Sequence, residues 1–126
     1  MPVKNKMYRL SDKVRDSIKK EVSKMLELGV IEHSSSPWSS SVVLVPKTIQ
    51  PGAAPELRFC VDYRGLNSVT KTDAHTIPQT DELIELGAAR FLSTFDLISS
   101  YSQISLIPGA HERSSFSAPA GQFQSK

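Results

Sequence analysis

Asp96 is the residue whose sequence surroundings most clearly raise a chemical question. It directly follows the apolar and β-prone run "RFLSTF" and precedes the Ser- and Tyr-containing stretch "LISSYSQI". The apolar run favours a buried strand, so we expect the carboxylate at a strand end. A lone carboxylate there is either an ordinary strand-end residue or a ligand for a hard cation. The residue types alone leave both interpretations open.

Other residue types that commonly perform chemistry show no comparable arrangement. His33, His75 and His111 are scattered in loop-like sequence and lack the spacing of metal ligands. The serines of "HSSSPWSSS" have no partner His and Asp that would favour a serine nucleophile, and we interpret this stretch as a loop. Cys60, the single cysteine, cannot form an intrachain disulfide, and its apolar surroundings favour a buried structural thiol.

The amino-acid composition limits the classes of protein to which the chain can belong. The chain has 126 residues, of which 39% are hydrophobic and 22% charged, as expected for one globular domain. No apolar run approaches membrane-spanning length, and the start lacks the apolar core of a secretory signal. We therefore expect an intracellular protein, cytoplasmic or nuclear, with no membrane partner.

Positive charge is concentrated at one end of the chain. The net charge is only +2, but residues 1–24 hold eight Lys or Arg against three Asp or Glu. This asymmetry suits a polyanion such as nucleic acid. A Lys-rich helix face is also a common solvated surface, so the charge alone does not decide between the two.

A helix and a hairpin are the first elements that the sequence predicts. Apolar residues at three- and four-residue spacing predict an amphipathic helix from Ser11 to Leu28, with Ser11 as N-cap and Gly29 as the stop. Two β-rich stretches, 41–47 and 57–63, predict a hairpin with a long tip.

Further elements follow along the chain. Trp38 is expected to fill the core beneath the serine-rich loop, and residues 80–86 predict a short helix. Three more β-prone stretches predict strands over 90–97, 102–107 and 113–119. Helix, hairpin, short helix and further strands in this order predict a mixed α/β (α+β) fold.

Five stretches together form a specific combination: "YRLS", "KKEVSKMLELGVIEHSSSPWSSSVVLVPK", "LRFCVDYRGLNSVTKTDAHTIPQTDELIELGAARFLSTFDL", "YSQISL" and "SFSAPAGQF". In this order they resemble the reverse transcriptase of gypsy-type LTR retrotransposons, a retrovirus-like Pol family. The resemblance covers Tyr8 to Phe123. It implies a partial right-hand polymerase fold, with a lead-in over 1–10, a fingers-like region with the first palm elements over 11–90, and a truncated palm over 91–126.

The resemblance implies roles for the residues around Asp96. In the family, this Asp is a catalytic palm carboxylate that holds Mg²⁺ or Mn²⁺, and the backbone carbonyl of Leu97 is a further metal ligand. Tyr101 corresponds to the aromatic residue that packs beneath the sugar of the incoming dNTP.

Other positions are implied to contact substrate or nucleic acid. Lys47 and Arg58 correspond to fingers residues that reach the dNTP triphosphate. An RNA or DNA template-primer is the implied macromolecular partner. Its contacts would come from the polar residues Asp62, Arg64, Gln103 and Arg113, and Asp62 and Arg64 are also expected to form an ion pair.

Departures from the family pattern limit the expected activity. The sequence contains no Asp-Asp dipeptide, and Ser100 and Ser102 stand where the family usually has Gly and a large aromatic residue. We therefore expect a segment of a Pol polyprotein that does not polymerise DNA by itself, with self-association through unpaired palm strands. A non-catalytic nucleic-acid-binding module and an inert retroelement remnant are the alternatives.

Overall fold

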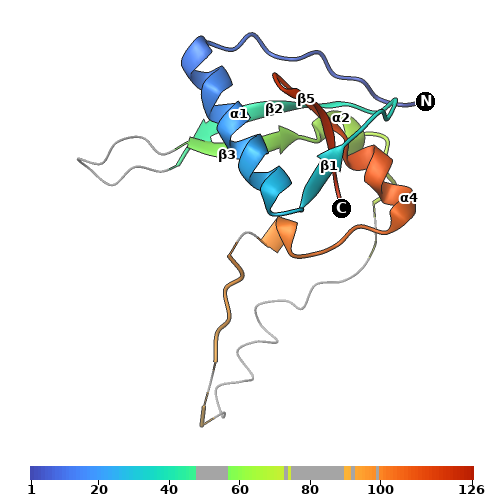
Figure 1. Ribbon diagram of the computed structural model, residues 1–126. Coiled ribbons are helices and arrows are strands. Elements are labelled where there is room, and N and C mark those ends of the chain that lie inside the picture. The colour runs from blue at the N-terminus through green and yellow to red at the C-terminus, as the bar shows by residue number, and fades with distance from the viewer. Residues whose placement is uncertain (48–56, 73, 75–89, 92, 99) are drawn as a thin grey trace.

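A computed structural model of the chain describes residues 1–47, 57–72, 74, 90–91, 93–98 and 100–126. One mixed β-sheet forms its centre, and the long helix α1 lies across one face of this sheet (Figure 1). Among the described residues, no helix is both long and apolar enough to cross a membrane.

Helix α1 spans Asp12–Glu27 and confirms the predicted helix. Ser11 precedes it in an extended conformation, and Leu28 follows it as the C-cap. Gly29 has a φ of 70°, a left-handed conformation that residues with a Cβ rarely adopt, so the chain can leave the helix there.

Five strands form the sheet: β1 (Ile31–His33), β2 (Ser40–Pro46), β3 (Leu57–Asp62), β4 (Phe116–Ala118) and β5 (Gly121–Ser125). Their order is β1-β5-β4-β2-β3. All neighbours are antiparallel except β2 and β4, which run parallel. The two C-terminal strands therefore lie between β1 and the β2–β3 hairpin. Four short helical elements complete the described structure: α2 (Arg64–Asn67), η2 (Ser100–Ser102), α4 (Pro108–His111) and η3 (Glu112–Ser114).

The core lies between α1 and the sheet. Ile18 and Val22 of α1 are fully buried, as is Phe123. The ring of Phe116 lies 5.8 Å from that of Phe59 and 5.9 Å from that of Phe123, measured between centroids. These aromatic contacts join the hairpin to the C-terminal strands, since Phe59 belongs to β3.

Side-chain hydrogen bonds hold the serine-rich loop before β2 in place. The amide Nε2 of Gln122 lies 2.8 Å from the backbone oxygen of Ser36, 2.9 Å from that of Trp38 and 2.8 Å from the hydroxyl of Ser115. The interpretation of this stretch as a loop is confirmed for residues 34–38, whereas His33 belongs to β1 and Ser40 and Ser41 belong to β2. The prediction that Trp38 fills the core is wrong, because its side chain is only half-buried.

Two of the predicted later strands are wrong within the described residues. Residues 93–97 and 102–107 are not strands, and residues 100–102 form η2. A β-strand requires a neighbour for its backbone hydrogen bonds, and none of the described strands pairs with this segment. Phe91 and Phe95 are accordingly 92% and 90% exposed.

Other sequence predictions are correct only in part. The strand predicted over 113–119 shortens to β4, while β1 and β5 were not predicted. Cys60 is half-buried rather than buried. The short helix predicted over 80–86 and the hairpin tip lie outside the described residues.

The ionisation of the Tyr63 hydroxyl can be used to test the packing around η3. Its hydroxyl donates a hydrogen bond to the backbone oxygen of Ser114, at 2.7 Å. Burial raises the pKa of Tyr63 from 10 to about 12, partly offset by the side chain of Ser125. The neutral phenol therefore stabilises the fold below pH 10, and this contribution is lost as the pH rises toward about 12.

An alkaline titration followed by phenolate absorbance is expected to show one late-ionising tyrosine, and Tyr63→Phe is expected to remove that late step. An unchanged titration in the Tyr63→Phe protein would contradict the burial described here.

Candidate nucleotide and nucleic-acid interface

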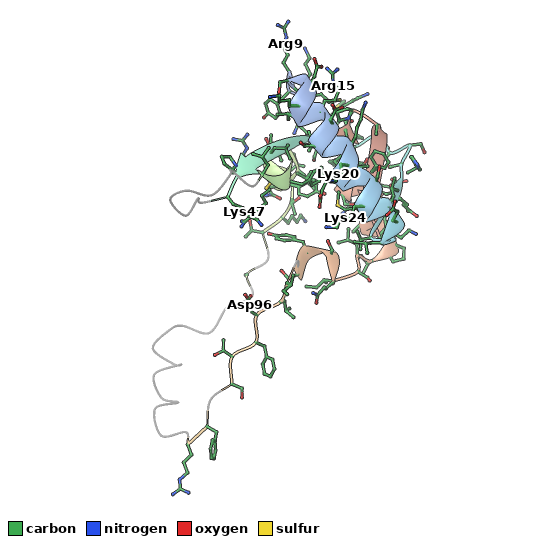
Figure 2. All side chains as sticks on the ribbon, turned by 60° about the vertical axis from the view of Figure 1, so that its left-hand side comes forward. Arg9, Arg15, Lys20, Lys24, Lys47 and Asp96 are labelled. Atoms are coloured by element: carbon green, nitrogen blue, oxygen red, sulfur yellow. The ribbon has the colours of Figure 1, made fainter. Side chains whose placement is uncertain are left out.

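Two of the predicted substrate-binding residues lie at the same end of the β2–β3 hairpin, where β2 ends and β3 begins. Arg58 lies opposite Val45 in the antiparallel register, and Lys47 directly follows Pro46, the last residue of β2. Arg58 is exposed and Lys47 is half-buried. Figure 2 shows Lys47 where the hairpin reaches residues that the structure does not describe. Two cationic side chains 11 positions apart thus belong to one end of one hairpin.

The register also determines the face of the sheet on which Arg58 lies. Directly opposed residues of an antiparallel pair share a face, so Arg58 and Val45 lie on the same side. Their neighbours Leu44 and Phe59 pack against the hydrophobic core beneath α1. Because side chains alternate along a strand, Arg58 lies on the face that is turned away from α1.

A second polar cluster joins the end of β3 to the N-terminal segment. The guanidinium of Arg64 donates to Asp62 from Nε to Oδ1 at 2.8 Å and from Nη2 to Oδ2 at 2.7 Å, and Nη2 also lies 3.5 Å from the Tyr8 hydroxyl. Tyr8 donates its hydroxyl to Asp62 Oδ2 at 3.1 Å, across 54 positions of sequence. The ion pair expected between Asp62 and Arg64 is present.

The electrostatics of this cluster stabilise the charged forms of both partners. Hydrogen bonds from the side chain and the backbone N–H of Arg64 hold the pKa of Asp62 well below its ordinary value of 3.8. The same carboxylate raises the pKa of Arg64. The Asp62 side chain is only 10% exposed, whereas that of Arg64 is 83% exposed.

The lowered pKa predicts a pH-dependent contribution to stability. The Asp62 carboxylate stabilises the folded state above pH 3.8, and this contribution is lost as the pH falls through the lowered pKa. We expect Asp62→Asn to be less stable than the unchanged chain at about pH 6, with the difference shrinking toward about pH 2. Urea unfolding across this range measures it, with Asp12→Asn as the control. A difference that stays constant with pH would contradict the charged interaction.

Asp96 lies on an extended stretch of the chain away from the sheet (Figure 2). Its side chain is exposed, and the described residues contain no group of three His, Cys, Asp or Glu side chains that could hold a metal ion. The described part of the chain therefore does not fit a metal centre, either at Asp96 or at the backbone of Leu97.

The remaining predicted site residues occupy separate places. Tyr101 lies in η2 with its side chain 97% exposed, and Arg113 lies exposed in η3. Gln103 donates a hydrogen bond from Nε2 to the backbone oxygen of Ile98 at 2.6 Å. That bond stabilises the local turn, and it uses one donor of the Gln103 amide.

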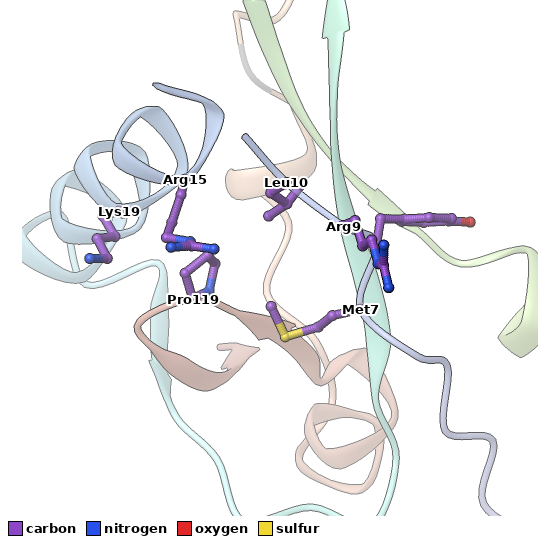
Figure 3. Close-up of a pocket in the computed structure, with 7 residues that line it drawn as sticks. Met7, Arg9, Leu10, Arg15, Lys19 and Pro119 are labelled. Carbon is purple, nitrogen blue, oxygen red and sulfur yellow. The ribbon is translucent and has the colours of Figure 1, made fainter. Parts of the chain in front are cut away.

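The structure contains a basic pocket that the sequence did not predict. It is open, has a volume of about 590 Å³, and is lined by Met7, Tyr8, Arg9, Leu10, Arg15, Lys19 and Pro119. Figure 3 shows that Arg15 and Lys19 belong to α1, with the Arg15 side chain next to Pro119, and that Met7 and Leu10 come from the N-terminal segment. The concentration of positive charge in residues 1–24 was the only sequence signal for it.

Nearly the whole chain is similar in sequence to known proteins. No model of a known protein family matches it. The retrovirus-related Pol polyprotein from transposon gypsy of Drosophila melanogaster is 34% identical over 125 residues, which are 98% of this chain and 12% of that polyprotein. The Pol polyprotein from transposon 297 of the same organism is 32% identical over 124 residues, with the same coverage of both chains. The chain is a homologue of one segment of the gypsy-type Pol polyproteins.

Viral polyproteins show a similar match in sequence. The enzymatic polyprotein of Cauliflower mosaic virus (strain NY8153) is 29% identical over 97% of this chain, which spans 18% of that polyprotein. The chain thus corresponds to a small part of each relative.

Solved structures establish the fold. The foamy viral protease-reverse transcriptase in complex with dsDNA matches all of this chain and 26% of its own with a TM-score of 0.74, at 19% identity. The same type of enzyme in complex with an RNA/DNA hybrid matches 98% of this chain and 16% of its own, with a TM-score of 0.72 at 20% identity. The Pol homologue therefore has a reverse-transcriptase-like fold, and the mixed α/β prediction is confirmed.

Proposed function

We propose that this Pol homologue supplies the dNTP-binding and template-side part of an RNA-directed DNA polymerase. The observation that carries the proposal is the β2–β3 hairpin, which brings Lys47 and Arg58 to one end in a chain that matches Pol polyproteins over nearly its whole length. In this proposal residues 1–10 lead in, 11–90 form the fingers-like region and 91–126 begin the palm.

The chemistry of the two cations suits a triphosphate. The planar guanidinium of Arg58 can stack on a base and donate paired hydrogen bonds to phosphate oxygens. Lys47 supplies a compact positive charge. Tyr101 would meet the sugar of the dNTP only if the η2 segment packs against further parts of a polyprotein.

Asp96 has a more limited role in the proposal. We assign it and the Leu97 carbonyl to the metal-binding residues of a longer Pol chain that supplies additional carboxylates, with Mg²⁺ or Mn²⁺ as the cation. Because the described residues do not fit a metal centre, we attribute no chemical step of this chain to a metal.

The template-primer is the proposed macromolecular partner. The structural neighbours are reverse transcriptases in complex with dsDNA or an RNA/DNA hybrid. Nucleic-acid contacts are proposed for exposed polar groups of this chain, namely Arg64, Gln103 and Arg113, with Asp62 orienting Arg64. An intracellular location, in the cytoplasm or nucleus, stays a prediction.

Binding of a fluorescent dNTP to the purified chain tests the proposal. Arg58→Gln and Lys47→Gln are each expected to weaken binding about tenfold, because each removes a charge-assisted contact to phosphate. Lys24→Gln removes the same charge from α1 and is expected to leave dNTP affinity unchanged. An equal loss in all three variants would indicate attraction by overall charge and would overturn the hairpin assignment.

A non-catalytic nucleic-acid-binding role is the second candidate, favoured by the cations of α1 and of the basic pocket. Steep weakening of nucleic-acid binding with salt, together with no dNTP binding, would favour this second candidate.

Self-association would be compatible with either candidate function. The exposed apolar side chains of the η2 region would support it; they are Phe95, Ile98, Tyr101, Ile104 and Ile107.

A further inference from the structure

The basic pocket combines positive charge with an apolar surface. Arg9, Arg15 and Lys19 contribute the charge, and no acidic side chain is among the described residues that line the pocket. Met7, Leu10 and Pro119 supply the apolar part. Such a pocket is suited to a ligand that carries an anionic group beside a less polar one, as a nucleotide unit of a nucleic-acid strand does.

An ion pair at the edge of the pocket leaves this charge available. Arg15 Nη1 lies 3.3 Å from Asp12 Oδ1, and the side chains of these two residues are 48% and 93% exposed. Exposed pairs of this kind contribute little free energy because water and salt screen them. A phosphate can therefore engage Arg15 without the loss of a strong interaction.

The N-terminal segment that forms one side of the pocket is attached to the sheet. The backbone N–H of Asn5 donates to the oxygen of Ser39 at 2.8 Å, and the Ser41 hydroxyl donates to the oxygen of Lys6 at 2.7 Å. The hydrogen bond of Tyr8 to Asp62 continues the attachment. Because the backbone that carries Arg9 is held in place, binding at the pocket loses less conformational entropy.

The pocket is separate from the hairpin surface proposed for dNTP. Arg15 and Lys19 extend from α1, whereas Arg58 lies on the face of the sheet that is turned away from α1. One compact substrate such as a dNTP cannot occupy both places. A long nucleic-acid strand can extend from one surface of the molecule to the other. The pocket therefore suits a polymer.

We infer that the basic pocket binds a backbone phosphate of a single nucleic-acid strand, with the adjoining sugar or base against Leu10 and Pro119. The inference rests on the proposed function, since it takes nucleic acid as the partner and adds a contact remote from the dNTP site. Arg9, Arg15 and Lys19 are its binding residues.

Fluorescence anisotropy with a labelled single-stranded RNA tests the inference. The double variant Arg15→Gln/Lys19→Gln is compared with Lys20→Gln/Lys24→Gln, which removes the same charge from exposed positions of α1 that do not line the pocket. Figure 2 shows Lys20 and Lys24 farther along the helix than Arg15. Circular dichroism confirms that each variant is folded, and Arg9→Gln replaces the pocket variant if that variant unfolds.

The pocket variant is expected to bind about tenfold more weakly at about 50 mM salt, and the slope of log affinity against log salt should fall by about 0.7, for the one phosphate contact that is lost. The control variant is expected to stay within about twofold. Equal losses in both variants, or no loss in the pocket variant, would overturn the inference and leave the proposed function standing. Absence of both RNA and dNTP binding by the unchanged chain would overturn the proposed function and the pocket with it.

Discussion

Replacing Phe116 by alanine is expected to lower the free energy of unfolding by about 3–5 kcal/mol. The side chain is 2% exposed and contacts the rings of Phe59 and Phe123, so its removal leaves a cavity between the hairpin and the C-terminal strands. A domain of this size commonly has only about 5–15 kcal/mol of stability in total. Urea denaturation followed by circular dichroism should show a large fall in the midpoint.

Phe95→Ala is the matched control, because it deletes the same atoms from a side chain that is 90% exposed. Its free energy of unfolding should change by no more than about 0.5 kcal/mol. A loss equal to that of Phe116→Ala would show that Phe95 is packed in the folded chain, contrary to the described arrangement.

Asp96→Asn is expected to reduce primer extension to background in a chimeric chain. The chimera joins these 126 residues to the following palm and thumb segment of a related Pol polyprotein, which supplies the carboxylates that this sequence lacks. The resemblance assigns Asp96 to the metal-binding carboxylates, and an amide is a poor ligand for a hard cation. A primer-template assay with Mg²⁺ or Mn²⁺ measures the effect, and the 126-residue chain alone is expected to extend no primer.

Asp12→Asn in the same chimera controls for the loss of one negative charge, and it should retain activity because Asp12 lies exposed at the start of α1. Activity that survives Asp96→Asn would contradict the assignment. Extension by the 126-residue chain itself would contradict the expectation of inactivity. A chimera inactive even with Asp96 intact would show that the sequence around Ser100 and Ser102 no longer supports catalysis, and a binding role would then replace the enzymatic one.

Local signals in the sequence predicted the elements whose structure depends on neighbouring residues. The period of apolar residues and the flanking Ser11 and Gly29 were sufficient to predict α1, because helix hydrogen bonds lie within a few residues of one another. Ser11 occupies the N-cap position, but its side chain makes no cap hydrogen bond. The β2–β3 hairpin was predictable for a similar reason, since its strands are close in sequence. The Asp62–Arg64 ion pair joins residues two positions apart and was also expected.

Elements that depend on distant partners were not predictable in the same way. Residues 90–97 are as β-prone as β2, yet the segment has no described neighbour to complete its hydrogen bonds. Conversely, β1 is a three-residue strand that exists because Ile31 pairs with Ser125 of β5 at the other end of the chain. Local propensity contains no information about such a partner.

The sequence by itself predicted the similarity to gypsy-type Pol polyproteins, the helix, the hairpin and a set of candidate site residues, because each of these predictions depends on short stretches and their order. Tertiary structure alone decided which side chains meet. It placed Arg58 on the face of the sheet turned away from α1 and tied Tyr8 to Asp62, and it gathered Arg9, Arg15 and Lys19 around one pocket. These arrangements depend on long-range strand pairing and on the packing of α1 over Phe116 and Phe123, which bring together groups that are remote in the sequence.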